Sequence, residues 1–447
     1  MKIIIIGGGV SGLAISCKLA KEKIDNLLIE KRPFLGGRAY SFYDNNSKEE
    51  IDNGQHVIVG ACKEFINFLS EINSIEKISF EKKLRIPVLN KNKLVNLQSH
   101  NFPIKILGKV FSILQYKHLK VRERISLLKT LYKISKMKPK DLKELDNENF
   151  YNWLKKNNQS TNTINCFWEL FAIPALNDEI KNVSASIGIR LFQVAFIESD
   201  INANFAIPNV GLTQLLGDSA ENFLKNTNTK IIKNQEIKSI VVQNDKISGV
   251  ITKDDRKIKS DIVISTLPPN QILDIIPKNY QSYFKKSKEI NMAPIVGIHL
   301  WFENYFFDEK FMVVLGSPIQ WIFNDSKIKN SNSSFQHIVI SLSNAWEWKN
   351  KPKKVVKEIF LEEINKLFPK SKKSKLINFS VIKMYNATFR CQPGIQKIRP
   401  KNRTKIRGLY ISGDWAESEW PSTMEAAVIS AKNTILDIKK DFGNKLQ

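Results

Sequence analysis

The chain has 447 residues, more than one hydrophobic core usually fills, so we expect two domains. Its 42% of hydrophobic and 25% of charged residues are typical of a globular protein and exclude a disordered or fibrous one. The net charge of +25 indicates either an anionic partner or a coding bias toward lysine, and nucleic acid is disfavoured because no recognisable nucleic-acid-binding module is present.

The first elements predicted are a strand, a glycine-rich turn and a helix. The strand covers residues 3–6, and an apolar helical face follows the turn. Gly7 permits a tight turn, Gly9 lets a diphosphate approach the backbone, and Gly12 lets the helix pack on the strand. The helix N-terminus, which includes Ser11, would present free N–H groups to the phosphates. The pattern predicts a dinucleotide site, and the alternative is a glycine-rich turn without a ligand.

The second strand of this unit ends at Glu30, which is followed by Lys31. Glu30 has the spacing of an acidic residue that accepts hydrogen bonds from a ribose diol. Gly36, Gly37 and Arg38 come next, before any third strand. This glycine doublet resembles that of FAD enzymes related to amine oxidases and carotenoid desaturases, in which Arg38 would add a cation beside the diphosphate. The sequence therefore favours FAD over NAD, although Arg38 could also be a solvated side chain.

A dense group of polar residues precedes an apolar run in the stretch 50–61. Asp52, Gly54, Gln55 and His56 stand directly before residues that predict a buried strand leading into a turn. Such a group is either a polar turn that satisfies its own backbone or the mouth of a ligand site. For His56, the alternative to a ligand contact is a core histidine whose hydrogen bonds are satisfied by a neighbouring residue.

The middle of the chain contains a basic segment and an aromatic one. Residues 102–138 mix apolar side chains with many lysines and arginines and hold one acidic residue, Glu123. This composition predicts basic, partly amphipathic helix near residues 102–138, suited either to an anionic membrane or to solvent. Trp168, Phe171 and Phe192 could line an apolar substrate tunnel or belong to the core.

Residues 231–252 predict a β-hairpin with Asn244-Asp245 at its turn, and residues 261–265 predict a buried strand. Near the C-terminus, residues 409–411 predict another strand. Together with the N-terminal unit, these segments predict a dinucleotide-binding domain assembled from three separated pieces of the chain, with the residues between them forming a second domain.

The last strand leads to Gly413-Asp414, a tight turn that would expose a carboxylate. A helix is predicted to start near Ser422, with Thr423 and Met424 in its first turn. Its N-terminus, aimed at a flavin, would stabilise the reduced anion by about 0.3–1 kcal/mol, and Asp414 would hold a ribityl hydroxyl. Glu425 fits a capping box, so the alternative is that it caps its own helix.

The four cysteines lie far apart and lack zinc or CxxC spacing, so neither a disulfide framework nor a metal site is predicted. No signal-peptide pattern and no apolar run of spanning length are recognised. We expect reduced thiols and a cytoplasmic location, with peripheral contact at the inner face of the cytoplasmic membrane if the basic segment binds lipid.

Along nearly the whole chain, the motifs resemble the FAD-dependent squalene-associated desaturase family, the hydroxysqualene dehydroxylases of hopanoid biosynthesis. The matching motifs occur in the family's order and are Asp52-Asn53-Gly54-Gln55-His56, Ala175-Leu176-Asn177, Pro208-Asn209-Val210-Gly211-Leu212, Ala387-Thr388-Phe389, Pro393-Gly394 and Gly413-Asp414-Trp415. Two positions depart from the pattern. Asn209-Val210 stands where a more basic, glycine-rich pair is usual, and Ala426 stands where glycine often follows the glutamate.

The resemblance implies an α/β fold in which a Rossmann-type FAD-binding domain of the glycine-doublet, amine oxidase-like type is interleaved with an α+β substrate domain. The expected FAD-binding segments are 1–80, 205–270 and 390–440. The expected substrate-binding segments are 81–204 and 271–389.

The resemblance also implies roles for single residues. Gly54 would let the backbone approach the isoalloxazine ring, with Gln55 and His56 beside it. Ile237 would place its backbone amide against the adenine. Asp52 or His56 would serve as the acid, and Asp52 would first need its pKa raised by burial.

The implied reaction replaces the hydroxyl group of hydroxysqualene, an apolar isoprenoid, by hydride from the reduced flavin and gives squalene. FAD supplies the redox chemistry, while the protein supplies orientation, water exclusion and a proton for the leaving oxygen. The alternatives are a carotenoid (phytoene-type) desaturase or a flavin amine oxidase, which take hydride from the substrate, and a non-enzymatic isoprenoid-lipid carrier on the same scaffold. The sequence does not identify the electron donor or the oligomeric state.

Overall fold

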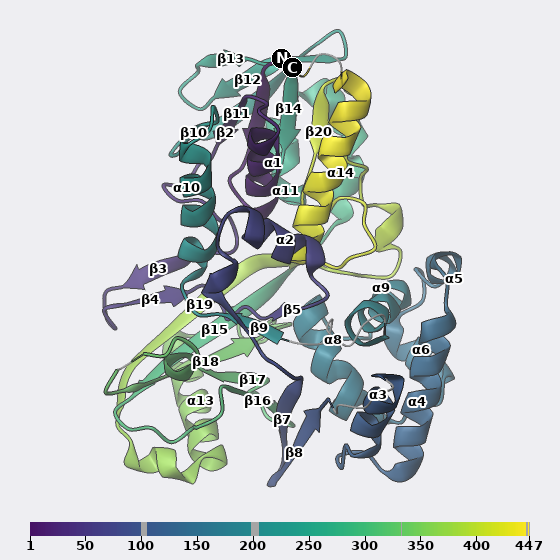
Figure 1. Ribbon diagram of the computed structural model, residues 1–447, viewed down its shortest axis with the longest axis vertical. Helices are drawn as coiled ribbons and strands as arrows, with labels where there is room; N and C mark the ends of the chain where they lie inside the picture. The colour runs from purple at the N-terminus through teal and green to yellow at the C-terminus, as the bar shows by residue number, and fades with distance from the viewer. Residues whose placement is uncertain (100–104, 198–204, 332, 444–445, 447) are drawn as a thin grey trace.

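The computed structural model describes residues 1–99, 105–197, 205–331, 333–443 and 446. Figure 1 shows two tiers. A parallel sheet flanked by helices forms the upper tier, where both chain ends lie. A large sheet and a group of helices lie side by side in the lower tier.

The upper tier is built on a five-stranded parallel sheet of order β10-β2-β1-β14-β20. Its strands are β1 (Ile3–Ile6), β2 (Asn26–Ile29), β10 (Lys230–Ile232), β14 (Ile262–Ser265) and β20 (Leu409–Ile411). The strands predicted over residues 3–6, 261–265 and 409–411 are therefore confirmed. Because the sheet combines segments from the start, middle and end of the chain, the fold brings residues distant in sequence to one sheet edge.

Each face of this sheet is covered, as expected for parallel strands rich in isoleucine. Ile3 and Ile5 pack with one set of helices, whereas Ile4 and Ile6 pack toward a three-stranded antiparallel sheet. The helices are α1 (Val10–Lys21), α2 (Lys63–Glu71), α10 (Ser219–Lys225) and α14 (Met424–Phe442), and the strands are β11 (Ile237–Gln243), β12 (Lys246–Thr252) and β13 (Lys257–Lys259). The predicted hairpin is confirmed, with Asn244 and Asp245 both at positive φ in its turn.

The lower tier is built on a seven-stranded sheet of order β19-β15-β18-β17-β16-β7-β8, antiparallel except for the β16–β7 pair. Its strands are β7 (Arg85–Asn90), β8 (Lys93–Gln98), β15 (Met292–Phe302), β16 (Phe311–Leu315), β17 (Trp321–Asn324), β18 (Gln336–Leu342) and β19 (Leu376–Phe389). Alternate residues of β15, such as Ile298 and Leu300, pack on α13 (Lys353–Leu367). The residues between them point to the opposite face of the sheet.

Helices fill the other half of the lower tier (Figure 1). They are α3 (Lys105–Leu114), α4 (Val121–Lys136), α5 (Pro139–Glu144), α6 (Phe150–Lys156), α7 (Thr161–Thr163), α8 (Glu169–Leu176) and α9 (Ala185–Phe192). Two further short helices, α11 (Pro269–Ile275) and α12 (Asp325–Ile328), are not part of this group. The basic helix predicted near residues 102–138 is two helices, α3 and α4, and residues 102–104 of that prediction lie outside the described residues.

The strand expected in the second half of the stretch 50–61 is shorter than predicted. Strand β4 (Glu49–Asp52) pairs with β3 (Ser41–Asp44), and only β5 (Ile58–Val59) follows it. β5 joins a small sheet with β9 (Phe205–Pro208) and β6 (Ile78–Phe80). Directly after β4, Asn53 donates from Nδ2 to the Arg38 carbonyl oxygen at 2.6 Å and from its backbone N–H to the Tyr40 carbonyl oxygen at 3.1 Å.

Among the described residues, no helix is both long and apolar enough to cross a membrane. All four cysteines are free thiols, and three of them are buried.

Candidate functional site

The two ends of the chain meet at the carboxyl edge of the parallel sheet. The Oγ atoms of Ser11, in the first turn of α1, and Ser412, directly after β20, lie 2.8 Å apart. Arg38 and Asp414 form an ion pair with a nitrogen–oxygen distance of 2.5 Å. The sequence predicted one site from both ends, and the structure brings these residues together.

The glycine turn after β1 leaves the start of α1 open. Gly7 has a φ of +103°, and a Cβ atom on Gly12 would lie only 1.9 Å from the Gly7 carbonyl oxygen. The N-cap residue is Gly9, no side chain caps the helix, and its first turn holds no acidic residue. Free N–H groups and the positive end of the helix dipole therefore face the turn, which fits the diphosphate of FAD.

Glu30 is buried beside this turn. Its two carboxylate oxygens accept hydrogen bonds from the backbone N–H groups of Gly8, at 2.6 Å, and Arg32, at 2.9 Å. A carboxylate has about four lone-pair positions, so capacity for a ribose diol remains. Lys31 is exposed. Ile237 opens β11 two residues after Gln235, whose N–H donates to the Glu30 carbonyl oxygen at 3.0 Å.

The glycine doublet packs directly on the first turn. Gly36 donates its N–H to the Gly8 carbonyl oxygen at 2.8 Å, and both Gly36 and Gly37 have positive φ. Arg32 donates to the Gly37 carbonyl oxygen at 2.9 Å and lies over the rings of Phe34 and Tyr40. Arg32 was not among the residues predicted for this site. The nearby aromatic residues Phe34 and Tyr40, over which it lies, could have indicated it.

The Asp414 turn is fastened by a second arginine that the sequence did not reveal. Arg399 is 5% exposed and donates to four backbone carbonyl oxygens, including that of Asp414 at 2.8 Å. The Asp414 carboxylate accepts from Arg38 and from the Ser422 hydroxyl. Nothing in the local sequence distinguishes Arg399 from a surface residue, because its partners come from the fold.

The start of α14 differs from the prediction in one respect. Thr423 is the N-cap and accepts from the Ala426 N–H at 3.2 Å, and the helix begins at Met424. Glu425 does not cap its own helix. Its carboxylate accepts from the N–H groups of Glu64 and Phe65, at 3.1 and 2.7 Å, and so caps α2. Burial raises the pKa of Glu425 to about 7.

Asp52 is a buried carboxyl group at the end of β4. It is 6% exposed, and its Oδ1 atom accepts a hydrogen bond from the Leu212 N–H at 2.9 Å. Burial raises the pKa of Asp52 to about 7, although Lys329 and the Leu212 N–H oppose the shift. A raised pKa is the condition for Asp52 to act as an acid, and burial of its side chain meets that condition.

Gly54 borders open space, because a Cβ atom built on it would meet no protein atom within 4 Å. The Nδ1 atom of His56 lies 2.7 Å from the Gly54 carbonyl oxygen. Burial lowers the pKa of His56, so its neutral form is favoured. Gln55 is half-buried between them. The space beside Gly54 is where the resemblance implied the flavin ring.

The aromatic residues named as substrate contacts form one cluster. The rings of Trp168 and Phe192 are 4.5 Å apart, and Phe171 and Phe196 are equally close. Trp168 and Phe192 are fully buried. Their contact with a substrate stays a prediction, since the same packing also fits the core alternative.

Two of the motifs that carried the family resemblance contact each other. Asn177, at a φ of +51°, donates from Nδ2 to the Thr388 hydroxyl at 2.8 Å. The motif that contains Leu212 contacts the Asp52 stretch through the Leu212 N–H. In each of these two pairs, motifs that are far apart in the sequence are adjacent in the structure.

Replacing Asp52 by asparagine should make folding less sensitive to pH. Because the pKa of Asp52 is about 7 when folded and about 4 when unfolded, the folded state binds more protons in this window, and wild-type stability falls as the pH rises through it. The amide of the variant cannot ionise, and its oxygen can still accept from Leu212. Between about pH 5 and pH 8, the variant should gain on the order of 2–4 kcal/mol relative to wild type in urea unfolding.

The control for this experiment is Asp255→Asn, because that carboxylate is exposed. It should follow the wild-type pH profile. If the Asp52→Asn protein lost as much stability as wild type between about pH 5 and pH 8, the raised pKa of Asp52 would be contradicted.

Solved structures of similar fold extend over almost the whole chain. An oxidoreductase from Methanosarcina mazei has a TM-score of 0.76 at 18% identity and covers 98% of this chain and 100% of its own. A putrescine oxidase with redesigned cofactor binding has a TM-score of 0.74 at 15% identity, covering 98% of each chain. These likenesses show the fold, including the predicted Rossmann-type architecture.

Curated relatives are similarly long. The 15-cis-phytoene desaturase of Synechococcus elongatus is 22% identical, covering 97% of this chain and 95% of its own length. The zeta-carotene desaturase of Synechocystis sp. is 19% identical, covering 97% and 96%.

The family comparison agrees with the open turn at α1, the glycine doublet and the acidic Glu30, which together fit FAD. When bound, this cofactor supplies hydride-transfer chemistry. From residue 10 to residue 434, the chain matches the model of the flavin containing amine oxidoreductases, and it belongs to that family as an FAD-dependent oxidoreductase.

Proposed function

We propose that this oxidoreductase is a hydroxysqualene dehydroxylase, which reduces hydroxysqualene to squalene in squalene and hopanoid biosynthesis. The carbon–oxygen bond breaks, hydride forms the new carbon–hydrogen bond, and a proton converts the departing hydroxyl group to water. The observation that supports this proposal is a buried carboxyl group, Asp52, with a pKa of about 7. Such a group holds a proton near neutral pH and can give it to a leaving oxygen.

Asp52 is the better of the two acid candidates. His56 has a lowered pKa and its Nδ1 atom is engaged with the Gly54 carbonyl oxygen, so it holds no proton to spare. We infer that His56 instead fixes the backbone around Gly54. Burial of Asp52 also means that water does not compete for its proton.

A phytoene-type desaturase is the second candidate, because relatives bear the names 15-cis-phytoene desaturase and zeta-carotene desaturase. That reaction removes hydride and a proton from a hydrocarbon, and an ionised Asp52 would accept the proton. An amine oxidase would also remove hydride. A lipid carrier without cofactor would purify as a colourless protein, whereas the proposal requires a flavin spectrum.

The dehydroxylase proposal predicts that the purified, chemically reduced holoprotein converts hydroxysqualene to squalene under anaerobic conditions. Asp52→Asn should lower the rate by about 10²–10⁴-fold with its flavin content unchanged, because the leaving oxygen loses its acid. Product is measured by gas chromatography. Desaturation of phytoene by the oxidised protein, without squalene formation, would replace this proposal by the second candidate.

The proposed flavin position makes a separate prediction for Gly54. Gly54→Ala should fold normally, because its methyl group meets no protein atom, yet it should weaken FAD binding about tenfold or more by filling the space beside the ring. Gly443→Ala is the matched control, since its methyl group also enters open space but at the end of α14. Flavin content and the melting temperature of both apoproteins are measured. Equal FAD affinity in the two variants would move the proposed flavin away from Gly54.

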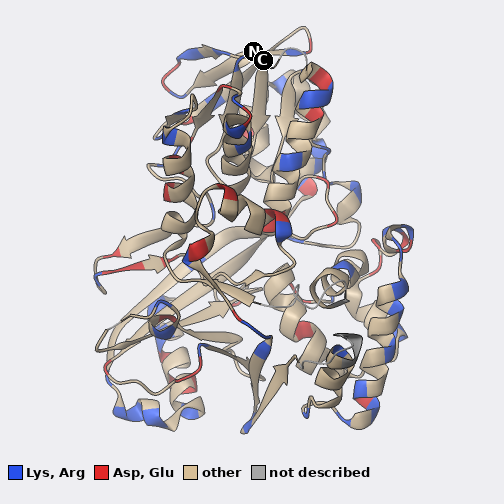
Figure 2. Ribbon diagram, in the orientation of Figure 1, with Lys and Arg blue, Asp and Glu red and all other residues tan. Residues whose placement is uncertain are grey.

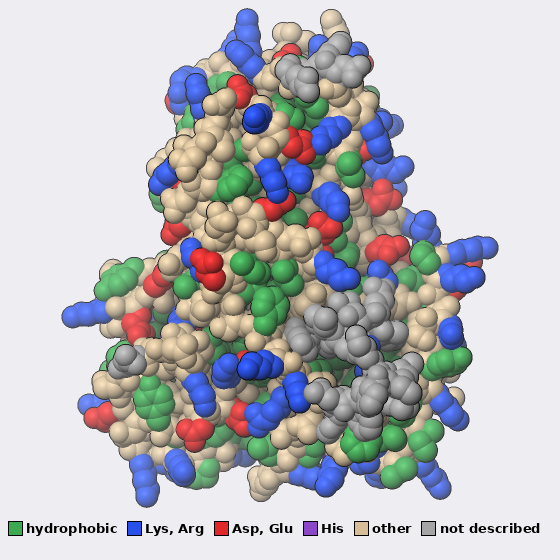
Figure 3. Space-filling view, in the orientation of Figure 1, with side chains coloured by type: hydrophobic (Ala, Val, Ile, Leu, Met, Phe, Trp, Pro, Cys, Tyr) green, Lys and Arg blue, Asp and Glu red, His purple; other side chains and the backbone are tan. Residues whose placement is uncertain are grey.

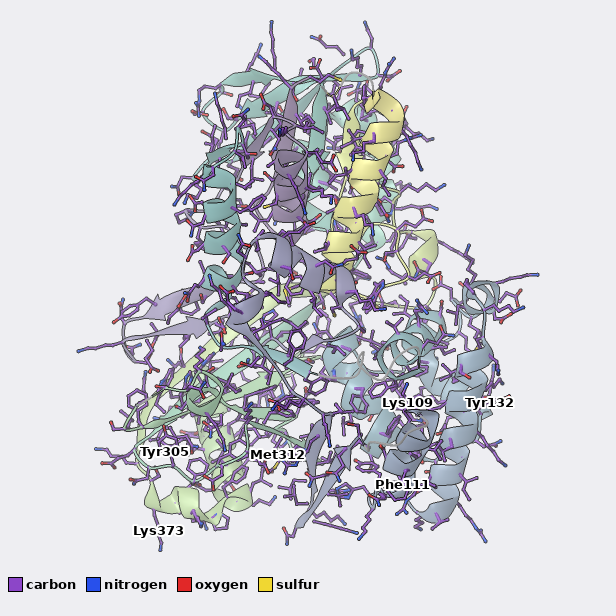
Figure 4. The ribbon with its side chains drawn as sticks, viewed as in Figure 1. Lys109, Phe111, Tyr132, Tyr305, Met312 and Lys373 are labelled. Carbon is purple, nitrogen blue, oxygen red and sulfur yellow. The ribbon has the colours of Figure 1, made fainter. Side chains whose placement is uncertain are left out.

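We also propose that α3 and α4 contact an anionic membrane, where an apolar isoprenoid would reside. The outer face of α4 exposes Val121 (64%), Ile125 (45%) and Tyr132 (67%), and α3 exposes Leu114 (40%). Lysines and arginines line the same helix in Figure 2, and Figure 3 shows basic and hydrophobic side chains interspersed at the lower right. Figure 4 marks Tyr132 on α4 and Lys109 and Phe111 on α3.

Reversing three charges on this face should release the protein from anionic vesicles. Arg122, Lys129 and Lys136 are exposed, and each basic residue near the surface contributes about 1 kcal/mol. Changing all three to glutamate should weaken sedimentation with phosphatidylserine vesicles by about 100-fold or more. The control makes the same change at Lys353, Lys354 and Lys357 of α13, which are also exposed. Equal loss in both triple variants would indicate net charge rather than a specific face.

A further inference from the structure

A cluster of buried aromatic and titratable side chains lies on one face of the large sheet. His299 and Trp301 are two residues apart on β15 and so point to the same face, and His337 on β18 lies opposite Trp301 in the ladder. All three residues are between 1% and 3% exposed. The proposed reaction gives none of them a role.

The cluster contacts both ends of strand β4, which carries the candidate acid. At the first residue of the strand, the Glu49 carboxylate accepts a hydrogen bond from Trp301 Nε1 at 2.6 Å. At the last residue, the Asp52 backbone carbonyl oxygen faces the His299 ring as an acceptor. Side chains of the large sheet thus reach the strand at the two positions that fix its course.

The hydrogen atom of His299 is on Nε2. The Nδ1 atom is 3.0 Å from His337 Nε2, so Nε2 is the nitrogen left for the Asp52 carbonyl oxygen. This contact falls short of ideal hydrogen-bond geometry, but a carbonyl oxygen attracts an N–H and repels a lone pair. Burial and the charge of His337 lower the pKa of His299 to about 3, although the Asp52 carbonyl opposes them. The ring is therefore neutral, and its Nδ1 atom is an acceptor.

An acceptor at His299 Nδ1 requires a donor at His337 Nε2. The other nitrogen of His337, Nδ1, is 3.0 Å from the Asp325 carboxylate, which is also 3.0 Å from Lys329 Nζ. Although burial would raise the pKa of Asp325, Lys329 and His337 outweigh it and hold the pKa below its usual range. Asp325 is thus an ionised acceptor, and His337 donates to it as well. A ring that donates from both nitrogens is an imidazolium ion.

The surroundings of His337 favour this positive charge. The Glu49 carboxylate is 4.0 Å from His337 Nδ1. The Trp301 ring stacks on the His337 ring with centroids 4.3 Å apart, and an aromatic face stabilises a cation placed over it. The titratable groups that face the two histidines come from β4, from α12 and from the residue after α12: Glu49, Glu50, Asp52, Asp325 and Lys329. Among these five groups only Lys329 is basic.

We propose that His299 and His337 are positioning residues for Asp52: a buried imidazolium at His337 fixes the neutral His299, which holds the Asp52 backbone carbonyl oxygen through its Nε2–H. This inference rests on the proposed function only for the role of Asp52 as the acid. The Leu212 N–H already holds the Asp52 side chain, and the histidines add a restraint on its backbone. An acid must stay aligned with the leaving oxygen, and a displacement of about 1 Å can cost on the order of 100-fold in rate.

The first test determines where the hydrogen atoms are. It uses holoprotein with oxidised flavin, which has no hydride for turnover, at pH 6, where Asp52 is mainly protonated. The chain has five histidines, so ¹⁵N-histidine labelling gives few signals, and His299→Phe and His337→Phe assign them. We expect hydrogen on both nitrogens of His337 and on Nε2 alone in His299. A neutral His337, or a His299 with its hydrogen on Nδ1, overturns the inference.

A second label reports the Asp52 backbone directly. The pair Asp-Asn occurs three times in the sequence, at residues 44–45, 52–53 and 146–147, so ¹³C-carbonyl aspartate combined with ¹⁵N-asparagine gives three peptide signals. His299→Phe removes the donor to the Asp52 carbonyl oxygen and should shift the 52–53 signal by more than the other two. His299→Gln should reverse part of this shift, because a glutamine amide can donate to the same carbonyl oxygen.

Rates separate positioning from general damage. In the reduced assay with hydroxysqualene, His299→Phe should lower kcat about tenfold or more and change KM by less than about threefold, with flavin content unchanged. His337→Phe should lower kcat by a smaller factor, because His299 keeps its N–H. His118→Phe is the control, because His118 is half-buried and bonded to the Val88 carbonyl oxygen. It should leave kcat and all three peptide signals unchanged.

The outcomes keep this inference apart from the proposed function. If the spectra are as expected but no squalene forms, the proposed reaction falls and the contact between His299 and Asp52 stands. If squalene forms but His299→Phe changes neither the 52–53 signal nor kcat, the inference falls and the proposed function stands. If His299→Phe does not fold, the wild-type histidine spectrum and the His299→Gln variant decide the question.

Discussion

The junction between the two ends of the chain is the constraint on which the rest of the structure depends. Strand β14 lies between β1 and β20, so the glycine turn and the Asp414 turn leave the same edge of one parallel sheet. Arg38 and Asp414 then pair across 376 positions of sequence. The Asp414 side chain is 6% exposed, and a carboxylate this deeply buried is costly without a cationic partner. The pair therefore couples the glycine doublet to the C-terminal turn, at the edge of the sheet that holds the candidate site.

Buried carboxylates repeat this arrangement on a smaller scale. Glu30 bonds the backbone of the first turn, Asp52 bonds Leu212, and Glu425 caps α2 from α14. In each case an acidic side chain satisfies backbone N–H groups that belong to a different segment. Such contacts fix the relative positions of loops that have little secondary structure of their own, because leaving the N–H groups unsatisfied would cost free energy. The same burial raises the pKa of Asp52 and Glu425 into the neutral range.

The polar groups near Gly54 contrast with the apolar interior of the protein. The aromatic cluster around Trp168 belongs to that apolar core. These polar groups are few: the Asp52 carboxyl group, which can hold a proton, the His56 ring, whose neutral form is favoured, and the Asn53 Oδ1 atom, which has no hydrogen-bond partner among the described residues. Hydride transfer benefits from the exclusion of water, and a small number of fixed polar groups can then decide which substrate reacts.

The sequence by itself determined the local elements and the cofactor class. The first strand, the glycine turn, the hairpin at Asn244-Asp245 and the last strand follow from short-range rules about apolar runs and turn residues. The strand predicted in the second half of the stretch 50–61 is shorter than expected, because its pairing depends on β9, which is far away in the sequence. The contacts of Glu425 and Arg399 could not be predicted either, since their partners lie on other elements. Only the tertiary structure decided that Asp52 is buried against the Leu212 N–H, because that partner stands 160 positions away along the chain and local sequence cannot identify it.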